Sequence, residues 1–220
     1  MNSNLLSPWN WNLYVITDEH LYKGRTHQEI AEAAIRGGAE VIQLRDKTAS
    51  GKYLYETGQN IRHLTHRAEV IFIVNDRVDV ALAVDADGAH VGAEDIPWKA
   101  ARRLLPSSKL LGGSARNLAE ALEAESGGAD YVGVGPIYEA RNTKPDAGIP
   151  KGLELLTRVK ERLKIPIIAI GGINEANVAE VIAAGADAIA VISAIVTADD
   201  MVDATRRLHE RILEAKAKRT

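Results

Sequence analysis

Residues 70–76 read Val70-Ile71-Phe72-Ile73-Val74-Asn75-Asp76, which is five apolar residues followed by two polar ones. A strand that is buried on both faces has this pattern, whereas a half-exposed strand alternates apolar and polar residues. The run Ile167-Ile168-Ala169-Ile170 has the same character. Strands buried on both faces belong to parallel sheets covered by helices, so these two stretches predict an α/β protein.

Apolar runs of this kind recur along the chain, and helical patterns separate them. The predicted strands are Leu13–Thr17, Glu40–Leu44, Val70–Val74, Gly88–Val91, Lys109–Gly112, Asp130–Val134, Pro166–Ile170 and Asp187–Ile192. Between them, apolar residues recur at spacings of three and four, as on helices with one buried stripe, in Gln28–Arg36, Leu118–Glu125 and Ala176–Ala184. Repeated strand–helix alternation predicts parallel strands with helical crossovers. A closed (β/α)8 TIM barrel is the economical arrangement, and a doubly wound open sheet is the alternative.

A repeated Gly-Ala-acid phrase precedes several of these runs. It occurs as Gly38-Ala39-Glu40, Gly128-Ala129-Asp130 and Gly185-Ala186-Asp187, and Asp87-Gly88-Ala89 is a looser fourth instance. A glycine just past a helix can adopt the left-handed conformation that closes the last turn. Each phrase therefore predicts a helix end that is followed at once by a strand.

The composition narrows the class of protein. With 220 residues and no linker or low-complexity tract, we expect one barrel domain over residues 13–220 after an extension of residues 1–12. A net charge of −3 argues against nucleic acid as a partner. The absence of cysteine excludes thiolate nucleophiles and Cys-ligated metals. Without a signal peptide or an apolar run of about 18 residues, we expect a cytoplasmic protein with no membrane partner, of open oligomeric state. We expect the basic end, residues 215–220, to be a solvated helix terminus.

Polar residues interrupt the second predicted strand, near the end where such barrels carry their active sites. Gln43 and Arg45 share one face of that strand, and Lys47 follows with the same parity. Ile42 and Leu44 occupy the opposite face, toward the helices. Two cations at the barrel mouth suit a polyanion such as a diphosphate. The alternative is a strand end whose charges simply reach solvent.

Carboxylates follow the third and fourth predicted strands. Asp76 ends the stretch quoted above, and Asp95 closes the segment that begins at His90. Neighbouring parallel strands lie about 4.8 Å apart, so the two carboxylates can meet over one point. Oxygen ligands of this kind favour one Mg²⁺ ion. The alternative makes Asp76 a helix N-cap and Asp95 a loop residue, with His90 a satisfied core histidine.

Two further segments come after the fifth and sixth strands. Ser114 follows the paired glycines 112–113, where a backbone can approach a ligand, and Asn117 is expected to cap the next helix. Ser114 is equally compatible with a plain turn. The longest connection, residues 139–150, is interpreted as a lid over an anion. Its polar residues are Arg141, Thr143 and Lys144.

The last two strands end in a pattern that suits a phosphate. Gly171-Gly172 follow the seventh strand, Ile192-Ser193 end the eighth, and Asn174 is placed to cap the intervening helix. Barrels of this class often bind phosphate on backbone N–H groups in these two loops. One site for a diphosphate and one for a monophosphate suggest a reaction between two such substrates. No nucleophile–base pair is recognisable in the sequence.

These motifs resemble the thiamine-phosphate synthase family over about residues 13–195. The matching stretches are Gln43-Leu44-Arg45-x-Lys47, Asn75-Asp76-Arg77, His90-Val91-Gly92-x-x-Asp95, Gly133-x-Gly135-Pro136-Ile137-Tyr138, Thr143-Lys144 and Ile170-Gly171-Gly172-Ile173. The resemblance implies a TIM-barrel transferase of thiamine biosynthesis. Such an enzyme joins hydroxymethylpyrimidine diphosphate to thiazole phosphate through Mg²⁺-assisted, dissociative loss of diphosphate. The thiazole nitrogen then captures the pyrimidine carbocation.

The resemblance also implies roles for individual residues. Diphosphate would be bound by Arg45, Lys47, Asn75 and Lys144, of which the three cations would be catalytic. Asp76 and Asp95 would hold Mg²⁺. Gln43 and Ser114, with His90 nearby, would contact the pyrimidine or diphosphate. The thiazole phosphate would be bound by Gly172 and the backbone at Ile192 and Ser193, and Thr143 would line the phosphate-binding loop.

One departure from the family pattern falls in this loop. The family often has Pro-Thr-x-Thr-Lys, whereas residues 139–144 are one residue longer and lack the first Thr. Arg141 or Asn142 is a candidate replacement for it. Two alternatives have different chemistry: a thiazole tautomerase and a non-catalytic sensor of thiamine precursors. Asp76, Asp95 and Pro136 argue against the tautomerase, whose relatives tend to lose the aspartate pair and to carry His in place of Pro136.

Overall fold

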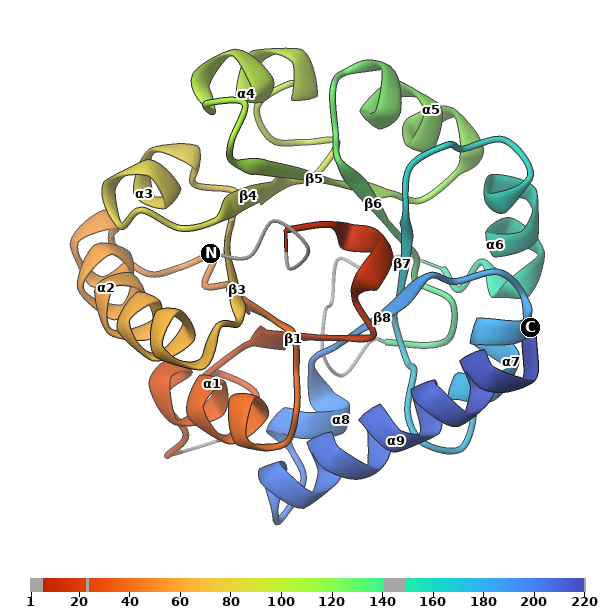
Figure 1. Cartoon of the computed structure of the whole chain (residues 1–220). Coiled ribbons are helices and arrows are strands. Elements are labelled where there is room, and N and C mark those ends of the chain that lie inside the picture. The colour runs from red at the N-terminus through yellow and green to blue at the C-terminus, as the bar shows by residue number, and fades with distance from the viewer. Residues whose placement is uncertain (1–5, 23, 141–148, 220) are drawn as a thin grey trace.

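The strands form one closed parallel barrel in the order of the sequence (Figure 1). In this computed structural model the described residues are 6–22, 24–140 and 149–219. The strands are β1 (Leu13–Thr17), β2 (Val41–Leu44), β3 (Ile71–Asn75), β4 (Gly88–Val91), β5 (Leu110–Ala115), β6 (Tyr131–Val134), β7 (Ile167–Ile170) and β8 (Ala188–Val191). Parallel pairing of β8 with β1 closes the sheet. The (β/α)8 TIM barrel is confirmed, and the open sheet is excluded.

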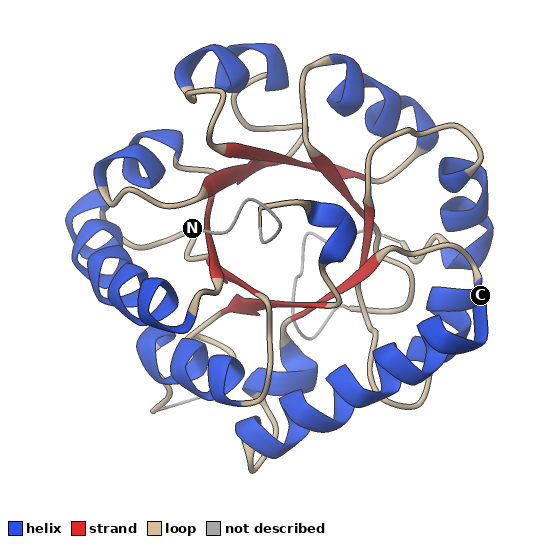
Figure 2. Cartoon of the chain, viewed as in Figure 1, coloured by secondary structure: helices blue, strands red, loops and turns tan. Residues whose placement is uncertain are grey.

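Helices form a ring around the strands (Figure 2). They are α1 (His27–Arg36), α2 (Gly51–Ala68), α3 (Val78–Ala83), α4 (Trp98–Leu104), α5 (Leu118–Ser126), α6 (Gly152–Lys160), α7 (Val178–Ala183), α8 (Ser193–Val196) and α9 (Met201–Arg219), and a 3-10 turn, η1, spans Pro8–Asn10. No helix in the described ranges has the length and apolar character needed to span a bilayer.

Local sequence explains where several helices begin. Thr26 and Glu29 form a reciprocal capping box at α1. Asn117 caps α5, as predicted, by accepting the Glu120 amide at 2.9 Å. The predicted cap at Asn174 is wrong, because its side chain accepts the Ala176 amide in a tight turn and α7 begins only after Asn177.

The alternation of side chains along β2 follows the predicted parity. Ile42 and Leu44 are fully buried, and Gln43, Arg45 and Lys47 line a pocket at the barrel mouth. One strand is longer than predicted: β5 runs through Ser114 to Ala115 and pairs there with β6. The paired glycines hid this continuation because they carry no side-chain pattern.

The Gly-Ala-acid phrase works as a helix end. Gly38, Gly128 and Gly185 have φ of 97°, 91° and 115°, in the left-handed region where a glycine carries no steric penalty. The fourth instance is wrong, because Gly88 already belongs to β4. At that corner Asp85 takes the left-handed conformation, with φ 53°.

The acidic residues that immediately precede the even-numbered strands form a repeated contact at the other end of the barrel. The carboxylates are Glu40, Asp87, Asp130 and Asp187. In this order they accept the backbone amides of Leu13, Phe72, Leu111 and Ile167 on the preceding strands, at 2.8, 2.8, 2.7 and 3.0 Å. Their cationic or imidazole partners on the helices are His209, Arg62, Arg102 and Lys160. Each carboxylate therefore joins two strands and one helix.

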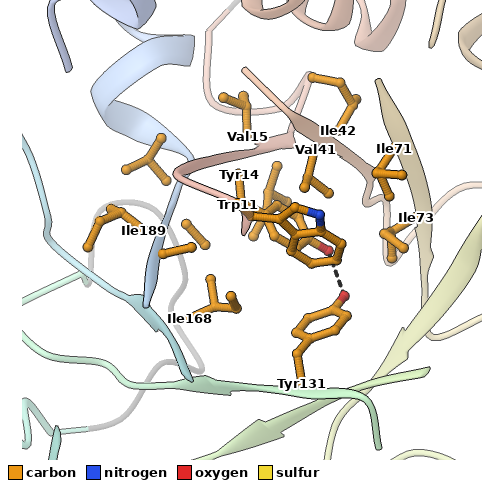
Figure 3. Close-up of a cluster of buried hydrophobic side chains, with 14 of the residues drawn as sticks. Trp11, Tyr14, Val15, Val41, Ile42, Ile71, Ile73, Tyr131, Ile168 and Ile189 are labelled. Carbon is orange, nitrogen blue, oxygen red and sulfur yellow. Dashed lines mark hydrogen bonds between the residues drawn. The ribbon is translucent and has the colours of Figure 1, made fainter. Parts of the chain in front are cut away.

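The segment before β1 packs into the barrel floor (Figure 3). The Trp11 ring is buried edge-on against Tyr14 and Tyr131, with ring centroids 6.0 and 5.1 Å away. Lys216 of α9 donates to the Trp11 carbonyl at 2.8 Å and to the Asn12 side chain at 2.7 Å. The prediction of a solvated C-terminal end is therefore wrong for Lys216.

Candidate active site

One pocket lies at the carboxyl ends of the strands. Every residue proposed for the site from sequence that falls in the described ranges lines it: Gln43, Arg45, Lys47, Asn75, Asp76, His90, Asp95, Ser114, Gly172, Ile192 and Ser193. Three others, Arg141, Thr143 and Lys144, lie outside the described residues. The topology thus brings together residues from strands that are far apart in the sequence, and their chemical roles stay predictions.

The cationic side of the pocket is formed by Arg45 and Lys47, which directly follow β2. Arg45 is held by an ion pair with Asp18, which follows β1, at 2.9 Å between Nη1 and Oδ2. Lys47 lies 3.9 Å from an oxygen of Asp76. A guanidinium that is anchored on one edge still offers its remaining N–H groups in a fixed direction, so Arg45 is pre-oriented for an anion.

The two predicted metal ligands meet in this pocket. Burial raises the pKa of Asp76 to about 6, and the hydrogen bond and negative charge of Asp95 add to the rise. Asp76 has φ 59° and donates its amide to the His90 carbonyl at 2.8 Å. It is not a helix N-cap, since Arg77 takes that position at α3. Asp95 accepts the Gly92 amide at 2.7 Å, which fixes its carboxylate.

A chain of hydrogen bonds crosses the floor of the pocket. Gln43 donates its side-chain amide to the Tyr14 hydroxyl at 2.7 Å. The Tyr14 and Tyr131 hydroxyls lie 3.0 Å apart (Figure 3). The Tyr131 hydroxyl also lies 3.3 Å from Nδ1 of His90. The chain ends at Ser114, whose Oγ lies 2.8 Å from Nε2 of His90.

Both ring nitrogens of His90 have a hydroxyl neighbour in this chain. Nδ1 lies at the Tyr131 hydroxyl and Nε2 lies at the Ser114 hydroxyl. These two contacts hold the imidazole and Ser114 at the pocket wall.

A glycine makes this arrangement possible. A Cβ at Gly112 would lie closer than 3.0 Å to atoms of both Tyr131 and His90, a separation that real Cβ atoms essentially never show. Gly112 is paired in register with both of these residues on the neighbouring strands. The missing side chain at Gly112 is the space in which the Tyr131 hydroxyl reaches the imidazole.

A second side of the pocket, at the ends of β7 and β8, is made of backbone. Gly171 and Gly172 have φ of 102° and 65°. A side chain at either position would collide with the connection that follows β6, because the Cβ atoms would lie 2.6 Å from Pro136 and 2.7 Å from the Glu139 carbonyl. Ser193 begins the short helix α8 beside them. This wall offers backbone groups rather than charges, as the phosphate-binding loops of such barrels do.

Three residues that shape this region were not among those proposed from the sequence. Tyr14 and Tyr131 form the floor, and Asp18 anchors Arg45. Tyr14 had a usable signal, since it has the inward parity of its neighbour Ile16, and both line the pocket. Asp18 had a weaker signal, as the first acidic residue after β1.

Comparisons with known proteins agree with this architecture. A family model described as thiamine monophosphate synthase matches residues 13–195. A thiamine-phosphate synthase of Chloroflexus aurantiacus is 58% identical over 90% of this chain and 91% of its own. One of Methanocella arvoryzae is 52% identical over 90% and 93%. The solved structure of a thiamine phosphate pyrophosphorylase from Pyrococcus furiosus superimposes with a TM-score of 0.87 at 44% identity and covers 96% of this chain and 99% of its own.

Proposed function

The chain belongs to the thiamine monophosphate synthase family, and we propose that it joins hydroxymethylpyrimidine diphosphate to thiazole phosphate, giving thiamine phosphate and diphosphate. It is a transferase of thiamine biosynthesis, as its relatives are. The observation that carries the choice of substrates is that one pocket has two walls whose chemistry suits anions. Arg45 and Lys47 lie on one wall, and the glycines 171 and 172 lie on the other. The lack of cysteine supports a cytoplasmic location.

The residues present fit one Mg²⁺ ion on the cationic side. Two carboxyl groups, Asp76 and Asp95, face each other closely enough that burial and mutual repulsion raise the pKa of Asp76 to about 6. A hard divalent cation held by both carboxylates would offset their repulsion. When bound, Mg²⁺ would supply positive charge for the departing diphosphate.

The chain's own residues account for the rest of the proposed mechanism. The guanidinium of Arg45 and the ammonium of Lys47 bind diphosphate oxygens and stabilise the charge that develops as the bond from the methylene carbon to oxygen breaks. Diphosphate leaves with the bonding electron pair. The thiazole nitrogen then donates its lone pair to the resulting carbocation and forms the new C–N bond. No side chain has to act as a nucleophile in either step.

The thiazole phosphate is proposed to bind at the backbone wall formed by Gly172, Ile192 and Ser193. Strand β1 lies between β2 and β8 in the barrel, so this phosphate and the diphosphate at Arg45 and Lys47 would bind at the ends of different, non-adjacent strands. The proposed contacts from Arg141, Thr143 and Lys144 to phosphate groups rest on the family resemblance.

The test of the proposal is incubation with both substrates and Mg²⁺, followed by mass detection of thiamine phosphate. We expect product from the wild type and loss of Mg²⁺-dependent coupling in Asp76→Ala and Asp95→Ala, with the fold retained. Asp79→Ala is the matched control, because this exposed carboxylate pairs only with Arg77 among the described partners. No product from the wild type would favour the tautomerase or sensor alternatives, and full activity of both variants would overturn the metal assignment.

A further inference from the structure

A second cluster of possible metal ligands lies outside the pocket, between the loops that follow β1 and β2. It consists of Glu19, His27 and Asp46, whose ligand atoms all lie within 4.8 Å of one another. None of the three lines the active-site pocket. Asp46 stands between Arg45 and Lys47 in the sequence, and those two residues line the pocket while Asp46 does not.

The buried imidazole of His27 is the observation that points to a ligand. Its side chain is fully inaccessible, and Nε2 has no hydrogen-bond partner among the described residues. Two carboxylate oxygens lie near it, 3.6 Å away on Asp46 and 3.8 Å away on Glu19. Both separations are too long for a hydrogen bond. A buried polar nitrogen left without a partner is costly, so its position needs a physical reason.

The tautomer of His27 shows what Nε2 presents to these oxygens. Nδ1 lies 2.7 Å from the Thr17 hydroxyl, and that hydroxyl donates its own proton to the Gln43 carbonyl. Thr17 therefore accepts from His27, and Nδ1 carries the ring proton. Nε2 is left with a lone pair that faces two carboxylates. Burial lowers the pKa of His27, which favours this neutral form.

Each of the three side chains is also held from behind, as metal ligands are. The Thr17 contact orients the imidazole of His27. Tyr53 donates its hydroxyl to the Glu19 carboxylate, 2.8 Å from each oxygen. Oδ1 of Asp46 accepts the amides of Thr48 and Ala49 at 2.8 and 2.9 Å, which leaves Oδ2 turned toward His27.

We propose that Glu19, His27 and Asp46 form a second metal site, which binds a divalent first-row transition ion of the Zn²⁺ class. One neutral imidazole and two carboxylates suit such an ion, whereas the imidazole disfavours Mg²⁺ and Ca²⁺. Ligand atoms around tetrahedral Zn²⁺ lie about 3.3 Å apart. Small side-chain movements would shorten the distances from His27 Nε2 to the Asp46 and Glu19 oxygens, now 3.6 and 3.8 Å, to that value.

A further imidazole lies beside one of the three ligands. The exposed ring of His20 already lies 3.0 Å from Oδ2 of Asp46. The ion would tie the loop after β1 to the loop after β2, and so fix the chain on both sides of Asp46. This proposal does not rest on the reaction proposed above, because no residue of the cluster belongs to the pocket.

The test uses the full chain, freed of metal with a chelator that is then removed. Co²⁺ is titrated and its visible d–d absorption is recorded, and Zn²⁺ affinity is measured by calorimetry in the presence of excess Mg²⁺. We expect one Co²⁺ ion to bind with an absorption spectrum typical of a low coordination number. The same spectrum should be recorded for Asp95→Asn. We expect the spectrum to be lost in His27→Gln and kept in His66→Gln, which is the matched control on exposed α2 surface.

A milder variant keeps the test decisive if His27→Gln does not fold. Tyr53→Phe removes only the hydroxyl that orients Glu19, and we expect roughly tenfold weaker Zn²⁺ binding with an unchanged circular dichroism spectrum. Absence of a Co²⁺ spectrum in the wild type would overturn the proposal. Equal Zn²⁺ affinity of Tyr53→Phe and the wild type would overturn it as well.

Discussion

Replacing Gly112 with alanine tests whether the floor of the pocket depends on a missing side chain. The new Cβ would lie closer than 3.0 Å to Tyr131 and to Nδ1 of His90, whereas ordinary van der Waals contacts begin at 3.4 Å. Both rings are buried, and the strands that carry them are paired with β5, so neither can move freely. Overpacking of this kind costs about 1–3 kcal/mol. For a chain of this size the melting temperature should fall by roughly 2–12 °C.

The same displacement should reach Ser114 through His90. We expect kcat/KM for thiamine phosphate formation to fall roughly tenfold to a hundredfold, because pocket groups lose their alignment. Gly133→Ala is the matched control for stability. It lies on the adjacent strand and lines the same pocket, yet its Cβ would approach no atom closer than 3.4 Å. Thermal unfolding and steady-state kinetics of the two variants decide the matter. If Gly112→Ala matches Gly133→Ala in both measurements, the reasoning about this glycine is wrong.

Three further predictions concern the two ends of the barrel. Asp187→Ala should cost about 2–3 kcal/mol in urea unfolding, since the carboxylate accepts a strand amide and pairs with a lysine, while Glu214→Ala at an exposed ion pair should stay within about 0.5 kcal/mol. The hydrogen bond with Glu40 raises the pKa of His209. The protonated imidazole therefore stabilises the fold fully below pH 6.5, and this stabilisation is lost as the pH rises through the raised pKa. The difference in unfolding free energy between wild type and His209→Gln should be widest near pH 6 and should shrink in alkaline buffer. Arg45→Lys should lower kcat/KM roughly tenfold, because a lysine ammonium cannot bind Asp18 and a diphosphate at once as the planar guanidinium does. Equal kcat/KM values for the variant and the wild type would contradict the role assigned to Arg45.

The sequence predicts the barrel well because its strands are buried on both faces and leave an unambiguous apolar signal. It predicts strand ends less well where that signal stops. The strand β5 extends through Ser114 because hydrogen bonds to β6 continue there, and no residue pattern records such pairing. The left-handed turn at Asp85 is a similar case, since the prediction places this turn at Gly88, three residues later. The outcome at such corners depends on tertiary contacts rather than on the nearest glycine.

The pocket could be predicted in part, because inward parity and strand ends converge in any barrel of this class. Arg45, Asp76 and Asp95 were all identifiable in that way. The floor was not, because Tyr14 and Tyr131 come from β1 and β6 and meet only through the closure of the sheet. Gly112 illustrates the same limit. A side chain there would collide with Tyr131 and His90, and the sequence does not show that these residues surround it.

Acidic residues have compensated charges at one end of the barrel and uncompensated charges at the other. We expect the first group to contribute to stability and the second to activity. Where the even strands begin, each carboxylate is matched by a backbone amide and by a helix side chain, so its charge is compensated. Where the strands end, Asp76 faces a second carboxyl group, takes a left-handed backbone conformation and has its pKa raised to about 6. Charge compensation and ordinary backbone conformation are expected of a stable fold, and their loss at Asp76 indicates that ligands bind at the carboxyl ends of the strands. Substitutions at the compensated end should therefore change unfolding with little effect on KM, and substitutions at the strained end should do the reverse.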